Sequence, residues 1–193
     1  MIDKKTVYVI IPARGGSKRL HRKNIYPVLG KPMLHYSIAA SRKSQYVDKI
    51  FVSSEDKEIL NVAKNEKAIP VKRSVKNSQD HVFKQDAIVE CLDAIKEKFD
   101  PPDIIISLQA NSPEVQSEDL DKALEKFVKF NRNELMSFNP DLIQNAAFRI
   151  MIHDSVYQKT LSTKCGCFVT DYIDVHTRLD VEEVEKRLRS RVS

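Results

Sequence analysis

Three short apolar runs, rich in β-branched residues, most constrain how this chain can fold. They are the segments 7–11 (VYVII), 49–53 (KIFVS) and 104–108 (IIISL). Runs of this length, nearly unbroken by polar residues, are typical of strands that are buried on both faces of a parallel sheet. Parallel neighbours need crossover connections, so the sequence predicts helices between these strands.

Helical patterns fill the intervals between the three runs. Apolar residues recur on one face of the expected helices, and a proline precedes the first of them. The expected helices cover residues 33–41, 57–65, 85–99 and 117–129, and a last helix begins at the T-R-L-D sequence of residues 177–180. This alternation of strand and helix predicts an α/β fold with right-handed crossovers.

The segment 131–171 is less regular than the rest of the chain. Short strands are expected near residues 135–138, 147–151 and 166–170. A length of 193 residues suits one domain. We therefore expect residues 1–193 to form a single domain, with a shortened, irregular arm near 131–171.

Composition narrows the classes of protein to consider. Hydrophobic residues make up 41% and charged residues 31% of the chain, a balance typical of globular proteins. The three cysteines, Cys91, Cys165 and Cys167, form no disulfide framework, and the last two are too closely spaced for a zinc knuckle. Without an apolar run long enough for a signal peptide or a membrane span, a cytoplasmic protein is expected.

The loop between residues 12 and 24 carries the strongest chemical signal. It contains Gly15, Gly16 and a cluster of basic residues: Arg14, Lys18, Arg19, Arg22 and Lys23. In an open α/β sheet, ligands bind beyond the carboxyl ends of the strands, where this loop lies. The glycines permit positive φ angles and close approach of backbone N–H groups to an anion. The loop is neither a Walker nor a Rossmann motif, and it predicts a phosphate site, with a solvated basic turn as the alternative.

Four segments resemble the acylneuraminate cytidylyltransferases, which are also called CMP-N-acetylneuraminic acid synthetases. They read IPARGGSKRLHRKNI with LGKPMLHYSI, VDKIFVSSEDKEI, DIIISLQANSPEVQSEDLDKAL and IDVHTRLDVEEVE. The first is similar to the N-terminal signature of the family, and the second to its second strand and helix. The third resembles its LQ-x-[TS]-S-P segment, and the last its closing I-D-[IV]-D-T segment. The resemblance covers nearly the whole chain.

This resemblance implies a fold and an activity. The fold is a Rossmann-like, three-layer α/β structure with a mostly parallel sheet, of the nucleotide-diphospho-sugar transferase type. The activity is transfer of CMP from CTP to the anomeric hydroxyl of a keto-deoxy acid sugar, sialic acid or a relative, with release of pyrophosphate. It further implies an enzyme of carbohydrate biosynthesis with Mg²⁺ as cofactor, CTP and an acidic sugar as partners, and a homodimer.

The resemblance also implies roles for individual residues. Nucleotide binding falls to Arg14, Gly15, Gly16, Ser17, Lys18, Asn24 and Gln109, and catalysis to Arg14 and Lys18. Sugar binding falls to Arg73, Asp80, Gln109 and Ser112, and metal binding to Asp174 and His176. The basic loop suits this chemistry, because negative charge develops on phosphate oxygens when the α-phosphate is attacked.

One departure from the family pattern concerns the metal. His176 stands where the family has a second carboxylate, and it shares one face of an extended segment with Asp174. An imidazole suits Mn²⁺ or another softer divalent ion better than it suits Mg²⁺. Such a site would lose its metal below about pH 6.5, where an unperturbed histidine becomes protonated.

Two further departures concern the sugar. Asn111 replaces the usual Thr or Ser, and Glu114 is expected to repel an acidic sugar. The interval from Ser112 to Asp174 is shorter than in the family, which removes cover from the sugar site and weakens the expectation of a dimer. A catalytically weakened or inactive nucleotide-binding protein of the same fold is therefore the alternative.

A nucleic-acid partner and a membrane are not expected. The net charge is +5, which fits a pocket for a small polyanion as well as it fits a nucleic-acid surface. Aromatic residues make up only 7% of the chain and do not alternate with the basic residues. Binding of single strands relies on such aromatic stacking platforms.

Overall fold

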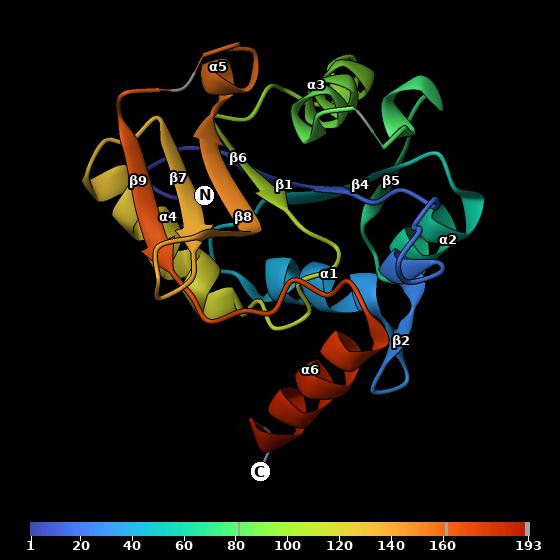
Figure 1. Ribbon diagram of the computed structural model, residues 1–193. Coiled ribbons are helices and arrows are strands. Elements are labelled where there is room, and N and C mark those ends of the chain that lie inside the picture. The colour runs from blue at the N-terminus through green and yellow to red at the C-terminus, as the bar shows by residue number, and fades with distance from the viewer. Residues whose placement is uncertain (81, 161, 192–193) are drawn as a thin grey trace.

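A mostly parallel sheet forms the centre of the molecule in the computed structural model, which describes residues 1–80, 82–160 and 162–191 (Figure 1). Over these residues the sheet has seven strands in the order β5-β4-β1-β6-β8-β7-β9. Strand β8 runs antiparallel to both of its neighbours, and the other pairs are parallel. The strands are β1 (Val7–Pro12), β4 (Lys49–Ser54), β5 (Ile69–Lys72), β6 (Ile104–Leu108), β7 (Glu134–Phe138), β8 (Gln144–Ile152) and β9 (Cys165–Val169).

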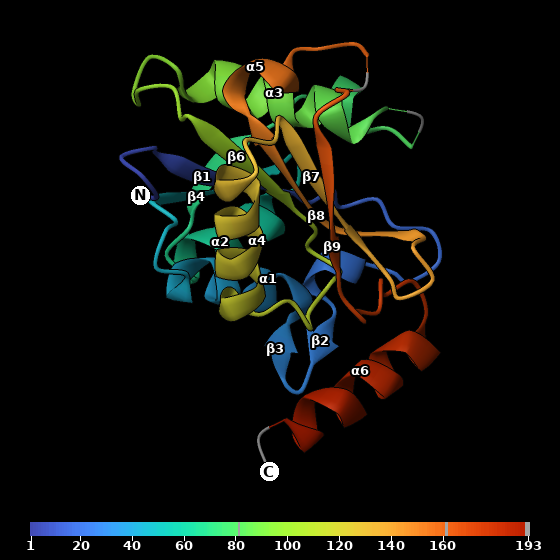
Figure 2. The same ribbon diagram turned by 90° about the vertical axis from the view of Figure 1, so that its left-hand side faces the viewer.

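Helices cover both faces of this sheet, which makes the three layers that the family resemblance implies. One face carries α3 (Lys84–Ile95) and the short α5 (His153–Val156). The other face carries α1 (Met33–Lys43), α2 (Lys57–Asn65) and α4 (Ser117–Lys129) (Figure 2). The last helix, α6 (Arg178–Ser190), extends away from the sheet beside the small hairpin of β2 (Pro27–Val28) and β3 (Lys31–Pro32).

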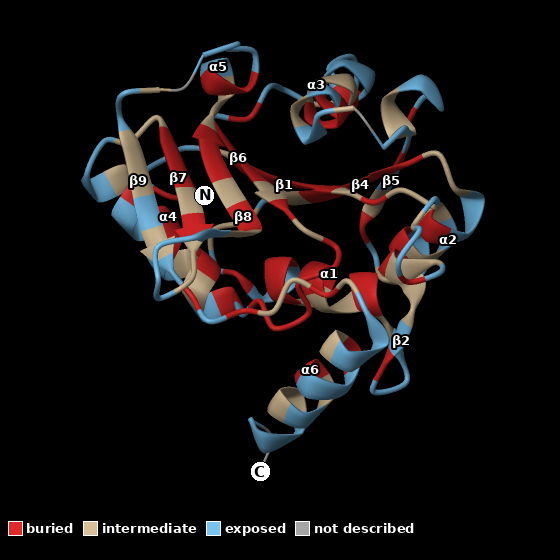
Figure 3. Cartoon of the chain, in the orientation of Figure 1, coloured by how far each residue is buried: buried red, intermediate tan, exposed pale blue. Residues whose placement is uncertain are grey.

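The apolar run of β1 is continuous because it serves two cores. Val9 and Ile11 pack into the core beneath α1, α2 and α4, while Tyr8 and Ile10 pack against α3. All four side chains are buried, as are most residues of the neighbouring strands β4 and β6, where only Lys49 and Ser107 are partly buried (Figure 3). Successive side chains of a strand point to opposite faces, so a strand between two helix layers needs apolar residues at every position.

Most expected elements are confirmed, and the differences have physical reasons. The helix expected over residues 85–99 is shorter in the structure, where α3 ends at Ile95. Strand β5 was not expected from the sequence. It is an edge strand without an apolar run, and its Pro70 and Lys72 are exposed. Proline is tolerated at such an edge, where its missing N–H breaks no ladder. In the segment 131–171, the three expected short strands are present as β7, β8 and β9.

The register of the central strands decides where a ligand can bind. Pro12 pairs with Ser53, and Ile10 with Ser107, so β1, β4 and β6 end at the same edge. The loops that follow these strands therefore meet there. No helix in the described part of the chain is long and apolar enough to cross a membrane.

The cysteines provide a simple test of this fold. Cys91 is fully buried between α3 and the sheet, and burial raises the pKa of its thiol to about 12. Cys165 is partly buried, and Cys167 is exposed. Because the thiolate is the reactive form, a disulfide reagent at pH 8 should label Cys167 rapidly and leave Cys91 unlabelled until the protein unfolds. Mass spectrometry of labelled peptides measures this, and rapid labelling of Cys91 in folded protein would contradict the core packing.

Candidate functional site

The loop after β1 folds back on itself and is fastened at both ends. Its first amide, the N–H of Ala13, donates to the carbonyl of Ser53 at 2.9 Å. Near its end, the buried Asn24 donates from Nδ2 to the carbonyl of Arg14, also at 2.9 Å. The expected nucleotide-binding residue Asn24 therefore closes the loop from within.

Glu55 joins the tip of this loop to Arg73, a basic residue outside the loop. The Gly15 N–H donates to Oε1 of Glu55 at 2.8 Å, and Arg73 donates to Oε2 at 3.2 Å. Arg73 is buried, and its Nε also donates to Ser78 Oγ at 3.0 Å. Burial by itself would raise the pKa of Glu55, but hydrogen bonds such as that from Gly15 outweigh it and lower the pKa. Glu55 is thus an anionic anchor for both groups.

The two loop glycines do not supply the positive φ angles that the sequence predicts. Neither Gly15 nor Gly16 has a positive φ. A Cβ on Gly15 would lie 3.0 Å from Cβ and 3.1 Å from Cγ of Asp56, and still closer to one of its carboxylate oxygens. A Cβ on Gly16 would meet nothing within 4 Å. Gly15 is therefore required for close packing on Asp56, while Gly16 faces open space.

Asp80 lies among the cations of the loop. It pairs with Arg14 and, at 2.6 Å, with the Nζ of Lys18. Hydrogen bonds from Lys18 and Arg14 lower the pKa of this carboxyl. The residue expected at the sugar therefore contacts the two residues expected to be catalytic, and it holds them side by side.

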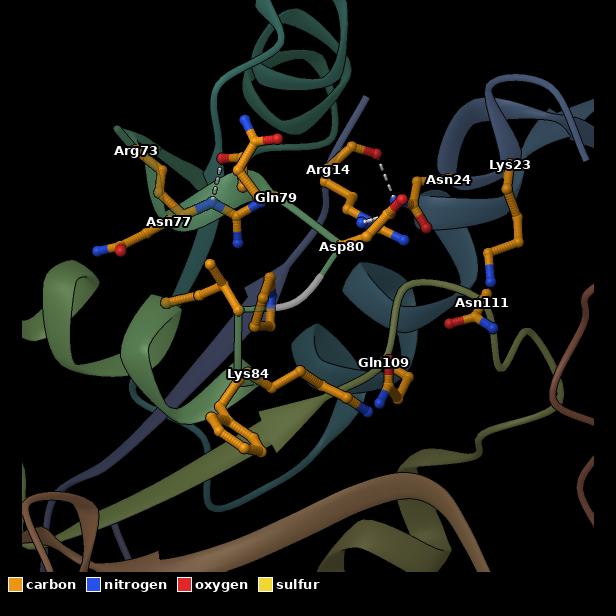
Figure 4. Close-up of a pocket in the computed structure, with 15 residues that line it drawn as sticks. Arg14, Lys23, Asn24, Arg73, Asn77, Gln79, Asp80, Lys84, Gln109 and Asn111 are labelled. Atoms are coloured by element: carbon orange, nitrogen blue, oxygen red, sulfur yellow. Dashed lines mark hydrogen bonds and ion pairs between the residues drawn. The ribbon is translucent and has the colours of Figure 1, made fainter. Parts of the chain in front are cut away.

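Three adjoining cavities form one groove along this edge of the sheet, which we call the cationic groove. The first cavity, of about 230 Å³, is shown in Figure 4 and includes Arg14, Lys23, Asn24, Arg73, Asp80, Lys84, Gln109 and Asn111 in its lining. The second, of about 300 Å³, is lined by Arg14, Ser17, Lys18, Arg19, Lys23, Asn24, Asp80 and His176. The third, of about 380 Å³, shares Phe83, Lys84 and Gln109 with the first.

Two lysines extend into the middle of the cationic groove. Figure 4 shows Lys84 reaching toward Gln109 and Lys23 reaching toward Asn111. Desolvation lowers the pKa of both, and the nearby Asp174 partly opposes this effect. Arg19, Arg14 and Lys84 lower the pKa of Lys23 further. This part of the groove is therefore crowded with positive charge, and a bound polyanion would relieve the repulsion.

The closing segment of the chain forms the far wall. Asn111 donates from Nδ2 to Asp174 and, at 3.0 Å, to the carbonyl of Val175. The Val175 N–H donates back to the carbonyl of Asn111 at 3.0 Å. Asp174 in turn lies 3.0 Å from Nε2 of His176. Asn111, which departs from the family pattern, thus fixes the segment that carries the two expected metal ligands.

The structure places Ser112 and Glu114 away from the lining of the cationic groove. Ser112, expected at the sugar, is fully buried and is not among the residues that line the three cavities. Glu114, expected to repel the sugar, is also buried and faces the last helix. Its Oε2 accepts from the Ile173 N–H at 2.9 Å, and its Oε1 accepts from Arg191 at 2.9 Å. Its charge holds α6 in place and does not face the groove.

The structure brings most of the expected residues together. Arg14, Ser17, Lys18, Asn24, Arg73, Asp80, Gln109 and His176 all line the first or second cavity. Gly16 lines a neighbouring depression with Ser17 and Lys18. Sequence reasoning missed Lys84 at the start of α3 and Arg149 on β8, which line the third cavity. No local motif marks either residue, because only the packing of α3 against β8 brings them to the groove.

Solved structures share this architecture. The structure of CMP:2-keto-3-deoxy-manno-octonic acid synthetase, complexed with CTP, superposes with a TM-score of 0.79 at 16% identity. The match covers 96% of this chain and 99% of that one. A 4-diphosphocytidyl-2C-methyl-D-erythritol synthase from Anaerococcus prevotii gives a TM-score of 0.68 at 13% identity, covering 97% and 98% of the two chains. The expected nucleotidyltransferase-type fold is confirmed.

The sequence carries the comparison further. Residues 8–160 match the family model described as cytidylyltransferase. A pseudaminic acid cytidylyltransferase from Campylobacter jejuni is 38% identical over 121 residues, which cover 62% of this chain and 52% of that protein. The post-translational flagellin modification protein B of Campylobacter coli is 30% identical over 83% of this chain and 68% of its own length. The matched part therefore spans about half the length of the first of these relatives. The chain belongs to the cytidylyltransferase family.

Proposed function

We propose that this chain transfers a cytidylyl group from CTP to a hydroxyl of an acidic keto-deoxy sugar and releases pyrophosphate. Membership of the cytidylyltransferase family supports the reaction class. Relatives named for pseudaminic acid, 3-deoxy-manno-octulosonate and N-acylneuraminate support an acidic sugar as acceptor. The observation that carries the proposal is the cationic groove at the carboxyl edge of β1, β4 and β6.

The first two cavities suit the nucleotide. They are lined by the cations Arg14, Lys18, Arg19, Lys23, Arg73 and Lys84, with Asp80 as their acidic member. The sugar hydroxyl forms a bond to the α-phosphorus, the bond from that phosphorus to the bridging oxygen breaks, and the hydroxyl proton passes to solvent. Fixed cations stabilise the charge that grows on the α-phosphate and on the pyrophosphate.

The third cavity suits the acceptor sugar. It lies beyond Gln109 and Lys84 and is also lined by Ser107 and Arg149. Lys84 and Arg149 are donors for a sugar carboxylate, and Gln109 separates this cavity from the nucleotide. Of the four residues expected at the sugar, Gln109 keeps that role in this proposal, while Arg73 and Asp80 serve the nucleotide end.

A pyrophosphate-release assay tests the proposal. Purified protein, CTP and Mg²⁺ are combined with pseudaminic, 3-deoxy-manno-octulosonic or N-acetylneuraminic acid, and ATP, GTP and UTP replace CTP in parallel. Release should require both CTP and one of the acidic sugars. Lys18→Ala should lower kcat/KM at least about tenfold, because it removes a charge-assisted contact to phosphate.

The matched control is Lys122→Ala, at an exposed lysine of α4 on the opposite side of the sheet from α3. It should leave kcat/KM unchanged. CTP binding without any release across the panel would instead support the alternative, an inactive nucleotide-binding protein. Equal release with ATP, GTP and CTP would contradict the assignment of CTP as the donor.

A further inference from the structure

His176 makes contacts that define how its ring is used. Its Nδ1 lies 2.8 Å from an Arg19 guanidinium nitrogen and 3.3 Å from the Lys23 ammonium. Both partners can only donate, so Nδ1 must accept. Its Nε2 lies 3.0 Å from the carboxylate of Asp174 and must donate to it. The ring is therefore a neutral imidazole that carries its proton on Nε2, and it joins one carboxylate to two cations.

This donor set does not fit the Mg²⁺ site that the family resemblance implies. Mg²⁺ prefers oxygen ligands in octahedral geometry. One oxygen of Asp174 accepts from Asn111 and the other from His176. Among the described residues, no group of three or more His, Cys, Asp or Glu side chains converges to hold a metal ion. Arg19 and Lys23 occupy the free side of the imidazole, where their charges would repel a divalent cation.

The same contacts direct positive charge into the second cavity. Arg19 and Lys23 both line it, together with Arg14 and Lys18. The side chains of Arg14 and Lys18 are also held, because both pair with Asp80. His176 and Asp80 thus act as two acceptors that hold four cations around one cavity. Such an arrangement can bind a phosphate chain without any further counter-charge.

We infer that His176 replaces a protein-held divalent ion in this chain: the neutral imidazole holds Arg19 and Lys23 toward the phosphate chain, so that the triphosphate is bound by protein cations. This inference rests on the proposed function, since it takes CTP as the ligand. It concerns binding, and it makes His176 a positioning residue that acts through Arg19 and Lys23.

Titration calorimetry with CTP, in EDTA and in excess Mg²⁺, tests the inference. Wild-type protein should bind CTP no more than about threefold tighter in Mg²⁺ than in EDTA, because the cations are already in place. His176→Asp should weaken binding in EDTA at least about tenfold, because it places a second carboxylate beside Asp174 and removes the neutral acceptor. Mg²⁺ should restore that variant, since two carboxylates suit this ion.

Two variants control for charge and for shape. His21→Asp adds the same charge at an exposed position of the same loop, and it should change CTP binding in EDTA less than about threefold. His176→Gln keeps a neutral side chain that can both accept and donate, and it should stay close to wild type in both conditions. Melting curves without ligand verify that each variant is folded.

Binding of Mn²⁺, followed by electron paramagnetic resonance, is a second measurement that does not depend on turnover. Without nucleotide, wild-type protein should leave Mn²⁺ free, and His176→Asp should bind it. CTP binding that is at least about tenfold tighter with Mg²⁺ in wild type, or a wild-type Mn²⁺ site that is lost in His176→Gln, would overturn the inference alone. No CTP binding in either condition would overturn the proposed function together with it.

Discussion

Replacing Arg149 by methionine should lower the free energy of unfolding by about 3 kcal/mol, because it leaves a fully buried carboxylate without its cation. Glu134 on β7 is 0% exposed. Arg149 on the adjacent strand β8 donates to its Oε2 from a terminal guanidinium nitrogen at 2.5 Å and from Nε at 3.1 Å. The other oxygen, Oε1, has no hydrogen-bond partner. The pair with Arg149 is therefore the main compensation for burying this charge.

Urea denaturation measures this cost, and a second substitution shows its origin. Glu134→Gln in the Arg149→Met protein should recover more than half of the lost stability, since it removes the uncompensated charge. Arg42→Met, at an exposed arginine of α1, should cost less than about 0.5 kcal/mol. If Glu134→Gln destabilises the Arg149→Met protein further, then lost packing of Arg149, and not the buried charge, explains the effect.

The central part of the fold follows from the sequence because its constraint is local. Strands β1, β4 and β6 are buried on both faces, so each needs an apolar run that can be recognised without its partners. Strand β5 is at an edge, and only its pairing with β4 makes it a strand. The antiparallel direction of β8 likewise depends on β6 and β7, and it has no signature in the 131–171 segment itself.

The part of the candidate site that lies in the loop after β1 could be predicted from the sequence. The cations of the loop after β1 lie together because they are close in sequence. Asp80 joins Arg14 across 66 positions, and Asn111 joins Asp174 across 63, so their contacts required the whole fold. Ser112 and Glu114 face inward, although both were expected to face the sugar, and the cause is similar. They lie in an irregular turn after β6, where no strand or helix period indicates which side chain faces inward.

On the proposed function, Gly15→Ala should lower both the affinity for CTP and kcat/KM by about tenfold or more, because a small shift of a loop that positions a substrate costs one to two orders of magnitude. The new Cβ would meet Asp56, which cannot easily yield. Its carboxylate caps α2 by accepting from the Glu58 and Ile59 N–H groups at 2.8 and 3.2 Å, and it also pairs with Arg22 at 3.2 Å. The backbone of Gly15 must therefore move, and its hydrogen bond to Glu55 is lost with it.

Gly16→Ala is the matched control, because it adds the same methyl group one residue later in the same loop. Its Cβ points into open space, and Gly16 is exposed with an ordinary φ. Stability, CTP affinity and kcat/KM should therefore stay within about twofold of wild type, as expected for a surface change away from any tight contact. Titration calorimetry and steady-state kinetics on the two variants make the comparison. Equal losses in both variants would mean that glycine flexibility throughout the loop matters, and that the contact with Asp56 does not explain why Gly15 is needed.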